Sequence, residues 1–582
     1  MRKTFNVLIL LIIWSCMPVS AQMKWINPLK EGSQFIHGRG WPSELKNNYH
    51  RFPARAKKTI RPEVWGLSHQ SAGLSIVFRS NAPEIKVRYG VSGGFAMPHM
   101  PATGVSGVDL YTTDIHGKRR WCAAQYAFGD TVTFHYKKLW YEEDYCGTGY
   151  EYHLYLPLYN EVKWLEIGVP EKSKFNLVPI SHEKPIIVYG TSIAHGACAS
   201  RPGMAWSNIV ERELEHPLIN LGFSGHGRLD ASIFDLMAEI DAKLYMIDCL
   251  PNMVWENAKY IYERTLDGVA RLRKANNAPI LLVEHSGYLN EYTSKFAADS
   301  YKEANAELRK AFNALKEQGV KDLYYLTKEE QGLTIDAMVE GVHPNDLGMR
   351  LYADGYIKKI REIFHQDSHL RTPFTACTQN RDGYNWKERH ESILKMNTED
   401  APEILMLGNS ITHYWSGEPA ANWARGKQSW STLFKGKKVR NLGFGWDRIE
   451  NGLWRIYHGE LDGYNAQKVF LLLGTNNLGL NSNEEIIDGI MELSRAAQLH
   501  QPTARIYVCG IMPRKDMEKR IATLNAELKN HVLEAGLSYI DLTSRLVKPD
   551  GAIKSELFVD GLHPNEEGYK EEAKMLEKAI NE

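Results

Sequence analysis

Two serines stand just after short apolar runs and could act as nucleophiles. Ser410 follows the run 404–407 after Gly408 and Asn409, and Ser192 follows the run 186–189 after Gly190 and Thr191. Such runs are typical of buried parallel strands, and ligands of open α/β sheets bind where such strands end. Both serines are therefore candidate nucleophiles.

Ser410 needs a general base, and the C-terminal part of the chain supplies a candidate. Asp560 precedes His563 by three residues, so both side chains can lie on one side of a turn. The carboxylate can then hold the imidazole in one tautomer, and the ring can remove the serine proton during attack on a carbonyl. Thr412 replaces the second glycine of the Gly-x-Ser-x-Gly elbow, which disfavours an ordinary α/β-hydrolase.

Acyl transfer also needs hydrogen-bond donors for the developing oxyanion, each worth roughly 3–4 kcal/mol. Two further strand ends supply candidates, the backbone N–H of Gly443 and the side-chain amide of Asn476. Taken singly, either residue is more often part of a turn. Because the carboxyl ends of parallel strands meet at one sheet edge, we expect Ser410, Gly443 and Asn476 to converge.

These residues recur at an almost constant offset in the preceding part of the chain. Ser192 corresponds to Ser410, Gly222 to Gly443, Asn252 to Asn476 and His343 to His563, and the four intervals agree to within a few positions. Four landmarks with one shared offset indicate tandem domains.

Strand and helix patterns alternate from residue 185 onward, which predicts two parallel sheets. In the first repeat we expect strands at 185–189, 218–223, 242–247, 279–283 and 323–326 and a helix at 300–319. In the second we expect strands at 403–407, 439–444, 468–473, 504–510 and 537–542 and helices at 385–402, 483–499 and 517–536. The polar, turn-rich residues 365–384 are predicted to link the repeats.

Residues 24–180 have a different pattern, with no catalytic constellation. Short β-branched and aromatic runs between Gly, Pro and Asp predict strands at 74–78, 85–89, 108–111, 132–136, 152–158 and 162–167. This is typical of an antiparallel β-sandwich. Because the connection to the next predicted strand is short, we expect the sandwich to pack against the first α/β domain and to contribute to its cleft.

Composition and the N-terminus bear on location and partners. The 582 residues contain 70 Lys+Arg and 70 Asp+Glu, which argues against binding to nucleic acid or a membrane surface. Residues 1–21 resemble a bacterial-type secretory signal whose apolar run is too short to span a bilayer. We therefore expect a secreted or periplasmic protein whose mature chain has no integral membrane segment; Cys16 as a lipoprotein cysteine is the alternative.

Six cysteines follow residue 21, and their spacing is not that of metal ligands. We expect no metal site and no cofactor. In an exported chain Cys122 and Cys146 could form a disulfide within the β domain, and buried free thiols are the other possibility.

The motifs around the second serine resemble the four conserved blocks of the SGNH (GDSL) hydrolase superfamily. The matching segments are Gly408-Asn409-Ser410-Ile411, Gly443, Gly474-x-Asn476 and Asp560-x-x-His563, and residues 439–477 are especially similar to the α-subunits of platelet-activating-factor acetylhydrolase. The resemblance implies a three-layer α/β/α fold with a flavodoxin-like sheet and a metal-free esterase. It also implies the roles: Ser410 is the nucleophile, Asp560 orients the base His563, and Gly443, Asn476 and the Ser410 N–H form the oxyanion hole.

The first repeat resembles the same superfamily with two departures. The segments Gly190-Thr191-Ser192-Ile193, Asn220-Leu221-Gly222 and Gly341-Val342-His343-Pro344-Asn345 match. The third block lacks Gly-x-Asn, which makes Asn252 the expected donor, and Glu340 replaces the Asp of the acid position. We expect a second active site built from Ser192, His343, Glu340, Gly222 and Asn252. Residues 107–111 resemble the Gly-x-Asp-Leu-Tyr signature of a β domain that precedes some SGNH esterases.

Together these observations predict a signal peptide at 1–21, a β-sandwich at 22–180, SGNH domains at 181–364 and 385–582, and a linker at 365–384. The expected function is a secreted serine esterase that acts on an acylated polysaccharide or oligosaccharide, with acetyl as the expected acyl group. Export, the β domain, an aromatic content of 11% and the many carbohydrate deacetylases in the superfamily favour this function. The alternatives are a hydrolase of lipid or phospholipid acyl esters and a glycan-binding protein with one degenerate site.

Overall fold

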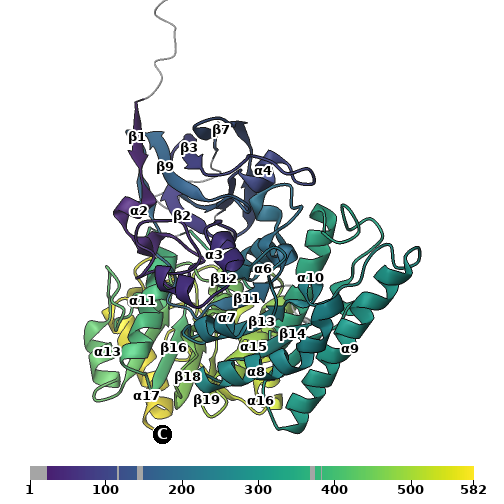
Figure 1. Cartoon of the computed structure of the whole chain (residues 1–582). Coiled ribbons are helices and arrows are strands. Elements are labelled where there is room, and N and C mark those ends of the chain that lie inside the picture. The colour runs from purple at the N-terminus through teal and green to yellow at the C-terminus, as the bar shows by residue number, and fades with distance from the viewer. Residues whose placement is uncertain (1–21, 115–116, 141–148, 367–373, 382) are drawn as a thin grey trace, which may run out of the picture.

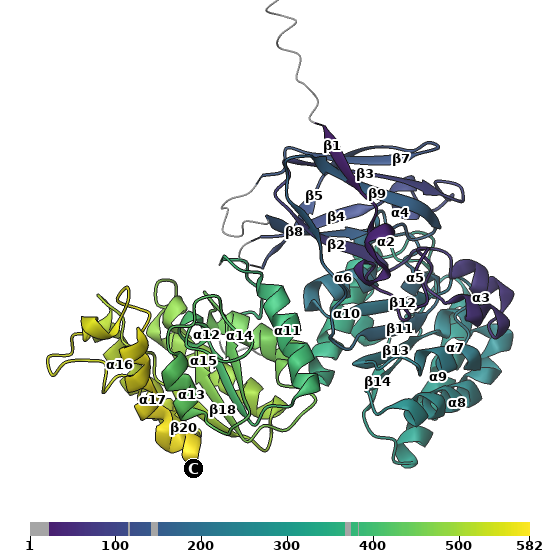
Figure 2. The ribbon, with the colours of Figure 1, turned by 90° about the vertical axis from the view of Figure 1, so that its left-hand side faces the viewer.

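A computed structural model describes residues 22–114, 117–140, 149–366, 374–381 and 383–582 (Figure 1). The predicted signal peptide at 1–21 lies outside these residues. The described chain forms an antiparallel β-sandwich and two parallel α/β sheets, as predicted, and the sandwich lies above the first α/β sheet in Figure 2.

Two five-stranded antiparallel sheets form the sandwich, in the orders β1-β9-β3-β7-β6 and β10-β2-β8-β4-β5. The strands are β1 (Met23–Ile26), β2 (Ser75–Ser80), β3 (Glu84–Val91), β4 (Asp109–Thr113), β5 (Arg119–Cys122), β6 (Ala124–Ala127), β7 (Val132–Lys137), β8 (Tyr150–Tyr155), β9 (Val162–Pro170) and β10 (Phe175–Leu177). Alternate residues of β3, such as Ile85, Val87 and Tyr89, are buried between the sheets. Cys122 is a free thiol in this core, and Cys146 lies outside the described residues.

The two α/β sheets share one topology, with strand orders β12-β11-β13-β14-β15 and β17-β16-β18-β19-β20. The first contains β11 (Ile186–Gly190), β12 (Leu218–Gly222), β13 (Leu244–Asp248), β14 (Ile280–Val283) and β15 (Leu323–Leu326). The second contains β16 (Ile404–Gly408), β17 (Val439–Gly443), β18 (Lys468–Leu472), β19 (Arg505–Cys509) and β20 (Ser538–Ile540). In each sheet the first strand lies between the second and third, which is the flavodoxin-like order, so the switch point lies beside the strand that precedes the serine.

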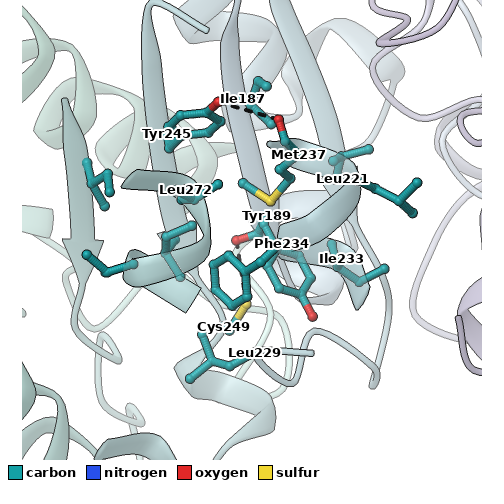
Figure 3. Close-up of a cluster of buried hydrophobic side chains, with 14 of the residues drawn as sticks. Ile187, Tyr189, Leu221, Leu229, Ile233, Phe234, Met237, Tyr245, Cys249 and Leu272 are labelled. Atoms are coloured by element: carbon teal, nitrogen blue, oxygen red, sulfur yellow. Dashed lines mark hydrogen bonds between the residues drawn. The ribbon is translucent and has the colours of Figure 1, made fainter. Parts of the chain in front are cut away.

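Helices cover both faces of each sheet because side chains alternate along each strand. In the first sheet, Ile187 and Tyr189 face one helical layer, whereas Ile186 and Val188 face the other. These layers are α7 (Ala231–Met237), α8 (Ile261–Ala275) and α9 (Lys295–Glu317) on one side and α6 (Trp206–Leu214) and α10 (Asp346–Ile363) on the other. Figure 3 shows Ile187 and Tyr189 packed with Phe234 and Met237 of α7.

The second sheet is covered in the same way. Leu405 and Leu407 face one layer and Ile404 and Met406 the other. The layers are α11 (Trp386–Glu399), α14 (Ile449–Arg455), α15 (Asn483–His500) and α16 (Glu518–Glu534) on one side and α13 (Lys427–Leu433) and α17 (Glu566–Asn581) on the other. Two three-layer α/β/α domains result.

The segment 41–67, which precedes the sandwich strands β2–β10, packs mainly against the first α/β sheet, and only its Tyr49 belongs to the described core of the sandwich. It includes α3 (Pro62–Leu67), which lies beside the α/β domain in Figure 2. Its buried residues Trp41, Leu45, Phe52, Ala56, Ile60 and Val64 share one core with Ile187 and Tyr189 of β11. We call 41–67 the leading segment. The predicted domain at 22–180 includes this segment, and tertiary packing shows which sheet its apolar side chains cover.

The described part of the predicted linker also packs closely. Phe374 lies in the core of the second α/β domain, and Gln379 Nε2 donates a 2.7 Å hydrogen bond to the carbonyl oxygen of Gly445. Residues 374–381 thus belong to the second α/β domain. No helix within the described residues combines the length and apolar character needed to cross a membrane.

Candidate active sites

Ser410, His563 and Asp560 are in hydrogen-bond contact at the carboxyl edge of the second sheet. Ser410 is the first residue of α12 (Ser410–His413), which follows β16, and its Oγ lies 2.8 Å from His563 Nε2. His563 Nδ1 lies 2.7 Å from Asp560 Oδ2. With the ring proton on Nδ1, His563 donates to Asp560 and accepts from Ser410, which is the arrangement that a general base requires.

The turn before α17 holds Asp560 in place. Its Oδ1 accepts hydrogen bonds from the backbone N–H groups of Leu562 at 3.0 Å and His563 at 2.8 Å. Gly561, between Asp560 and Leu562, has a φ of 80°, a conformation that favours glycine. Burial alone would raise the pKa of Asp560, but the hydrogen bonds from His563 and Leu562 lower that pKa to about 2. The carboxylate is therefore charged wherever a neutral imidazole can act as base.

The first repeat builds the same arrangement with a longer acid. Ser192 begins α5 (Ser192–His195), and its Oγ lies 2.8 Å from His343 Nε2. His343 Nδ1 is hydrogen-bonded to Glu340 Oε1, while Oε2 accepts from the N–H groups of Val342 at 2.8 Å and His343 at 3.1 Å. Glu340 thus makes the three contacts that Asp560 makes. Burial alone would raise the pKa of Glu340, but the hydrogen bonds from His343 and Val342 lower it.

The structure corrects the expected role of Gly443 and Gly222. The N–H of Gly443 donates to Asn441 Oδ1 at 2.8 Å, and that of Gly222 donates to Asn220 Oδ1 at 2.8 Å, so both donors are already paired. A Cβ would lie 2.2 Å from a backbone nitrogen of the serine-bearing helix at Gly443 and 2.3 Å at Gly222. These glycines therefore allow that helix to pack directly on the second strand.

Asn476 and Asn252 both contact the loop that follows the second strand of their sheet. Asn476 Nδ2 donates to the carbonyl oxygen of Asp447 at 2.9 Å, which leaves one amide hydrogen for a substrate. Asn252 Oδ1 accepts from the N–H of Gly227 at 3.1 Å, which leaves its Nδ2 as a donor. The structure therefore brings both asparagines to the expected edge, beside this loop.

The same loops contain a feature that the sequence interpretation missed. Trp446 follows Gly443 by the same interval as Gly225 follows Gly222, and the two residues have φ values of 63° and 72°. A large residue rarely has a positive φ, so the shared conformation indicates a backbone orientation that the site uses. The N–H groups of Trp446 and Gly225 are candidate oxyanion donors in place of Gly443 and Gly222. The nearly constant offset between the repeats is the signal that could have found them, because it pairs Gly225 with Trp446, three positions after Gly222 and Gly443.

The sandwich and the leading segment both line the pocket around the Ser192 site. This pocket has a volume of about 440 Å³ and is lined by Glu63, Leu67, Gln70, Met97, His99, Tyr159, Ala197, Ser224, His226 and His343. The ring of His99, from the sandwich, lies 5.9 Å from that of His343. The expected contribution of the sandwich to the first cleft is thus confirmed.

The Gly-x-Asp-Leu-Tyr segment docks the sandwich onto the loop that follows Ser192. Asp109 accepts from the guanidinium of Arg201 at 2.5 Å and from the N–H of Gly203 at 3.0 Å. Tyr111 accepts from the same guanidinium at 2.5 Å. Asp109 and Tyr111 therefore have a structural task, namely to hold residues 201–203 against the sandwich.

Aromatic rings extend from the Ser410 site toward solvent, from the buried Tyr414 to the exposed Trp423. The ring of Tyr414 lies 5.6 Å from that of His563, and the ring of Trp423 lies 6.0 Å from that of Tyr414. Trp423 is 56% exposed and Trp446 is 51% exposed. The two sites thus differ, because Ser192 lies in a pocket shared with the sandwich and Ser410 lies beside exposed indole rings.

A serine with a paired histidine and carboxylate at the switch point of a flavodoxin-like sheet defines a serine acyl hydrolase of the SGNH type. Residues 183–361 and 406–571 each match a profile of the GDSL-like Lipase/Acylhydrolase family, and residues 23–175 match the N-terminus of the Esterase_SGNH_hydro type. The chain belongs to this family and is an ester hydrolase with two SGNH domains.

Individual relatives agree with this assignment. A candidate GDSL-like lipase from Bacteroides ovatus is 30% identical, with a TM-score of 0.53, and the alignment covers 59% of this chain and 98% of that one. The platelet-activating factor acetylhydrolase IB subunit alpha2 of Gallus gallus is 27% identical over 222 residues, 37% of this chain and 92% of that protein. The alpha1 subunit of Homo sapiens is 25% identical over 201 residues, 34% of this chain and 82% of that protein.

Proposed function

We propose that the protein is a secreted carbohydrate esterase that removes O-acyl groups, with acetyl as the preferred group, from a polysaccharide or oligosaccharide. The observation that carries this proposal is the indole ring of Trp423, which is 56% exposed and lies outward of His563, next to the buried ring of Tyr414. A flat indole face suits the C–H face of a pyranose ring, and its N–H edge suits a hydroxyl group. Such a surface can hold a sugar while its ester group reaches Ser410.

In the proposed mechanism, His563 Nε2 takes the proton from Ser410 Oγ as the oxygen attacks the ester carbonyl. The oxyanion of the tetrahedral intermediate accepts hydrogen bonds from Asn476 and from the N–H groups of Ser410 and Trp446. His563 then protonates the departing sugar oxygen, and an acyl-serine remains. Water attacks this acyl group with His563 as base again, so that carboxylate is released and Ser410 regains its proton.

Ser192 has the same proposed role at the first site, with Glu340 and His343 as its partners. Because its pocket contains sandwich residues and its flanking loop differs, we expect the two sites to prefer different ester positions or glycans. The alternative substrate class is a lipid acyl ester, which the names of the acetylhydrolase relatives suggest.

The deciding experiment measures acetate release from acetylated xylan and pectin beside a panel of phospholipid esters. We compare the wild type with Ser192→Ala, Ser410→Ala and the double variant. We expect glycan esters to be hydrolysed, each single variant to lose part of the substrate range, and the double variant to lose about 10³-fold or more in rate. Faster turnover of phospholipids would favour the alternative, and a folded double variant with near-normal rates would exclude the serine mechanism.

Trp423→Ala separates glycan binding from chemistry. We expect KM for acetylated glycan to rise about tenfold, corresponding to roughly 1.4 kcal/mol, with little change for a small activated acetate ester. Trp164→Ala is the matched control, since Trp164 is 37% exposed on β9 of the sandwich. Equal effects of the two variants on glycan hydrolysis would remove the support that Trp423 gives to a carbohydrate substrate.

A further inference from the structure

Three side chains of metal-ligand type meet at the first active site. Cys198 Sγ, a carboxylate oxygen of Glu340 and a ring nitrogen of His343 all lie within 4.8 Å of one another. Cys198 is remote from Glu340 and His343 in the sequence, so no spacing motif indicated the cluster. The sequence spacing that argued against a metal site does not describe this tertiary cluster.

We propose that Cys198, Glu340 and His343 form an inhibitory site for a thiophilic divalent cation such as Zn²⁺. Thiolate, imidazole and carboxylate are the usual protein ligands of zinc, with metal–ligand distances of about 2.0–2.3 Å. Three donor atoms within 4.8 Å of one another need only small movements to surround one ion, and water supplies the fourth position. The thiolate distinguishes this group from sites for Mg²⁺ or Ca²⁺, which prefer oxygen ligands.

The backbone holds Cys198 beside the site. The N–H groups of Gly196 and Ala197 donate to the carbonyl oxygen of Ser192 at 3.0 and 2.9 Å, which closes a tight turn at the end of α5. Cys198 itself has a φ of 69° and is only 6% exposed. The thiol therefore has a set position, and the side chain of Glu340, which is 40% exposed, leaves a path from solvent.

Metal binding would block the base. In the free site His343 Nδ1 is bonded to Glu340, and Nε2 is the acceptor for the proton of Ser192. A cation on Nδ1 takes the lone pair there, so the ring proton moves to Nε2, which can then no longer accept a proton. The Cys198 thiol releases its proton to solvent, and thiolate and carboxylate together balance the charge of the ion. This inhibition rests on the proposed activity of Ser192, whereas the binding itself does not.

The Ser410 site differs from the Ser192 site in its ligand-type side chains and serves as a comparison. Ser416 follows Ser410 by the same interval as Cys198 follows Ser192, so the second repeat has a serine at the sequence position of the thiol. A hydroxyl is a poor zinc ligand, and within the described residues no third ligand-type side chain gathers with Asp560 and His563. We therefore expect a cation to inhibit the Ser192 site and to spare the Ser410 site.

Binding is tested with Co²⁺ on the full chain, because a cobalt–thiolate bond gives an absorption band that nitrogen and oxygen ligands do not. Two other clusters, His50–His69–Glu161 and Glu183–His216–His458, contain no cysteine. We expect one equivalent of the band, lost in Cys198→Ser and kept in Cys249→Ser, whose thiol is also free and buried. A missing band, or a band unaffected by Cys198→Ser, would overturn the site.

Inhibition is tested with Ser410→Ala, in which only Ser192 can react, and with Ser192→Ala, in which only Ser410 can. If Zn²⁺ binds with a Kd of about 1 μM, ~10 μM Zn²⁺ should inhibit Ser410→Ala about tenfold. A chelator should reverse this inhibition, and Ser192→Ala should be unaffected. Adding Cys198→Ser to Ser410→Ala should abolish the inhibition, with each protein compared with its own metal-free rate.

A cobalt band with undiminished rates would overturn the inhibitory role alone. A Ser410→Ala protein without activity would instead contradict the proposed first site, while the cobalt band still decides the binding.

Discussion

The guanidinium of Arg51 donates a 2.6 Å hydrogen bond to the carbonyl oxygen of Gly222, although the two residues are remote in the sequence. The same group binds the carbonyl oxygens of Leu67 at 2.7 Å and Asn220 at 3.3 Å. In the second domain Arg389 Nε donates to the carbonyl oxygen of Gly443 at 2.8 Å. Each domain thus uses one buried arginine, from the leading segment or from α11, to hold the end of its second strand.

We predict that Arg51→Met lowers stability and first-site activity together. Removal of the guanidinium leaves buried carbonyl groups unpaired, so the free energy of unfolding should fall by about 2–4 kcal/mol. Because the carbonyl of Gly222 lies beside the Ser192 site, hydrolysis by Ser410→Ala should fall more than hydrolysis by Ser192→Ala. Urea unfolding and paired rate measurements check both effects. Arg55→Met, whose side chain is 45% exposed, is the control; an equal loss in both variants would contradict the prediction.

Asp560→Asn should lower kcat at the second site by about 10²–10⁴-fold with a smaller change in KM, because the amide cannot hold His563 in the required tautomer. Glu340→Gln should do the same at the first site. A pH–rate profile adds a further check. Since the pKa of Asp560 is lowered to about 2, any loss of rate near pH 5 comes from another group and should persist in the variant. Disappearance of that acid limb in Asp560→Asn would assign it to Asp560.

Glu572 predicts a pH dependence of stability. This residue of α17 is fully buried, both carboxylate oxygens lack a hydrogen-bond partner among the described residues, and burial raises its pKa to about 8. An acid with a raised folded pKa costs no stability below its unfolded value of about 4.3, and the cost grows with pH until it levels off above the folded value. The slope is at most about 1.4 kcal/mol per pH unit in between.

Glu572→Gln should therefore stabilise the protein more at pH 8 than at pH 5, by a few kcal/mol. Chemical denaturation at both pH values measures the difference. Glu577→Gln on the exposed face of the same helix serves as control and should show no such dependence. A stability difference between wild type and Glu572→Gln that does not change with pH would show that the carboxylate is already charged in the folded protein.

His99→Ala should alter substrate binding at the first site alone. His99 lines the Ser192 pocket and its ring lies 5.9 Å from that of His343. We expect KM to rise about three- to tenfold in the Ser410→Ala background and to stay unchanged in the Ser192→Ala background. His135→Ala, on β7 and outside this pocket, is the control. An effect of His99→Ala on the Ser410 site would show that the variant acts through the whole fold.

Much of this architecture could be predicted from the sequence because its signals are local. Apolar runs such as 404–407 indicate buried strands wherever they occur, and Asp560 reaches His563 because the two are only three positions apart. The nearly constant offset that relates Ser192 to Ser410 and His343 to His563 revealed the duplication, and two copies of one pattern predict two copies of one sheet.

Only the tertiary structure decided which surfaces meet. The leading segment 41–67 covers the first α/β sheet, His99 of the sandwich reaches the Ser192 pocket, and Cys198 lies beside Glu340 and His343. It also decided that the N–H of Gly443 is paired, which leaves the N–H of Trp446 as the candidate oxyanion donor. Hydrophobic period and residue spacing describe neighbours along the chain, whereas these contacts join residues that are remote in the sequence and depend on how whole layers pack.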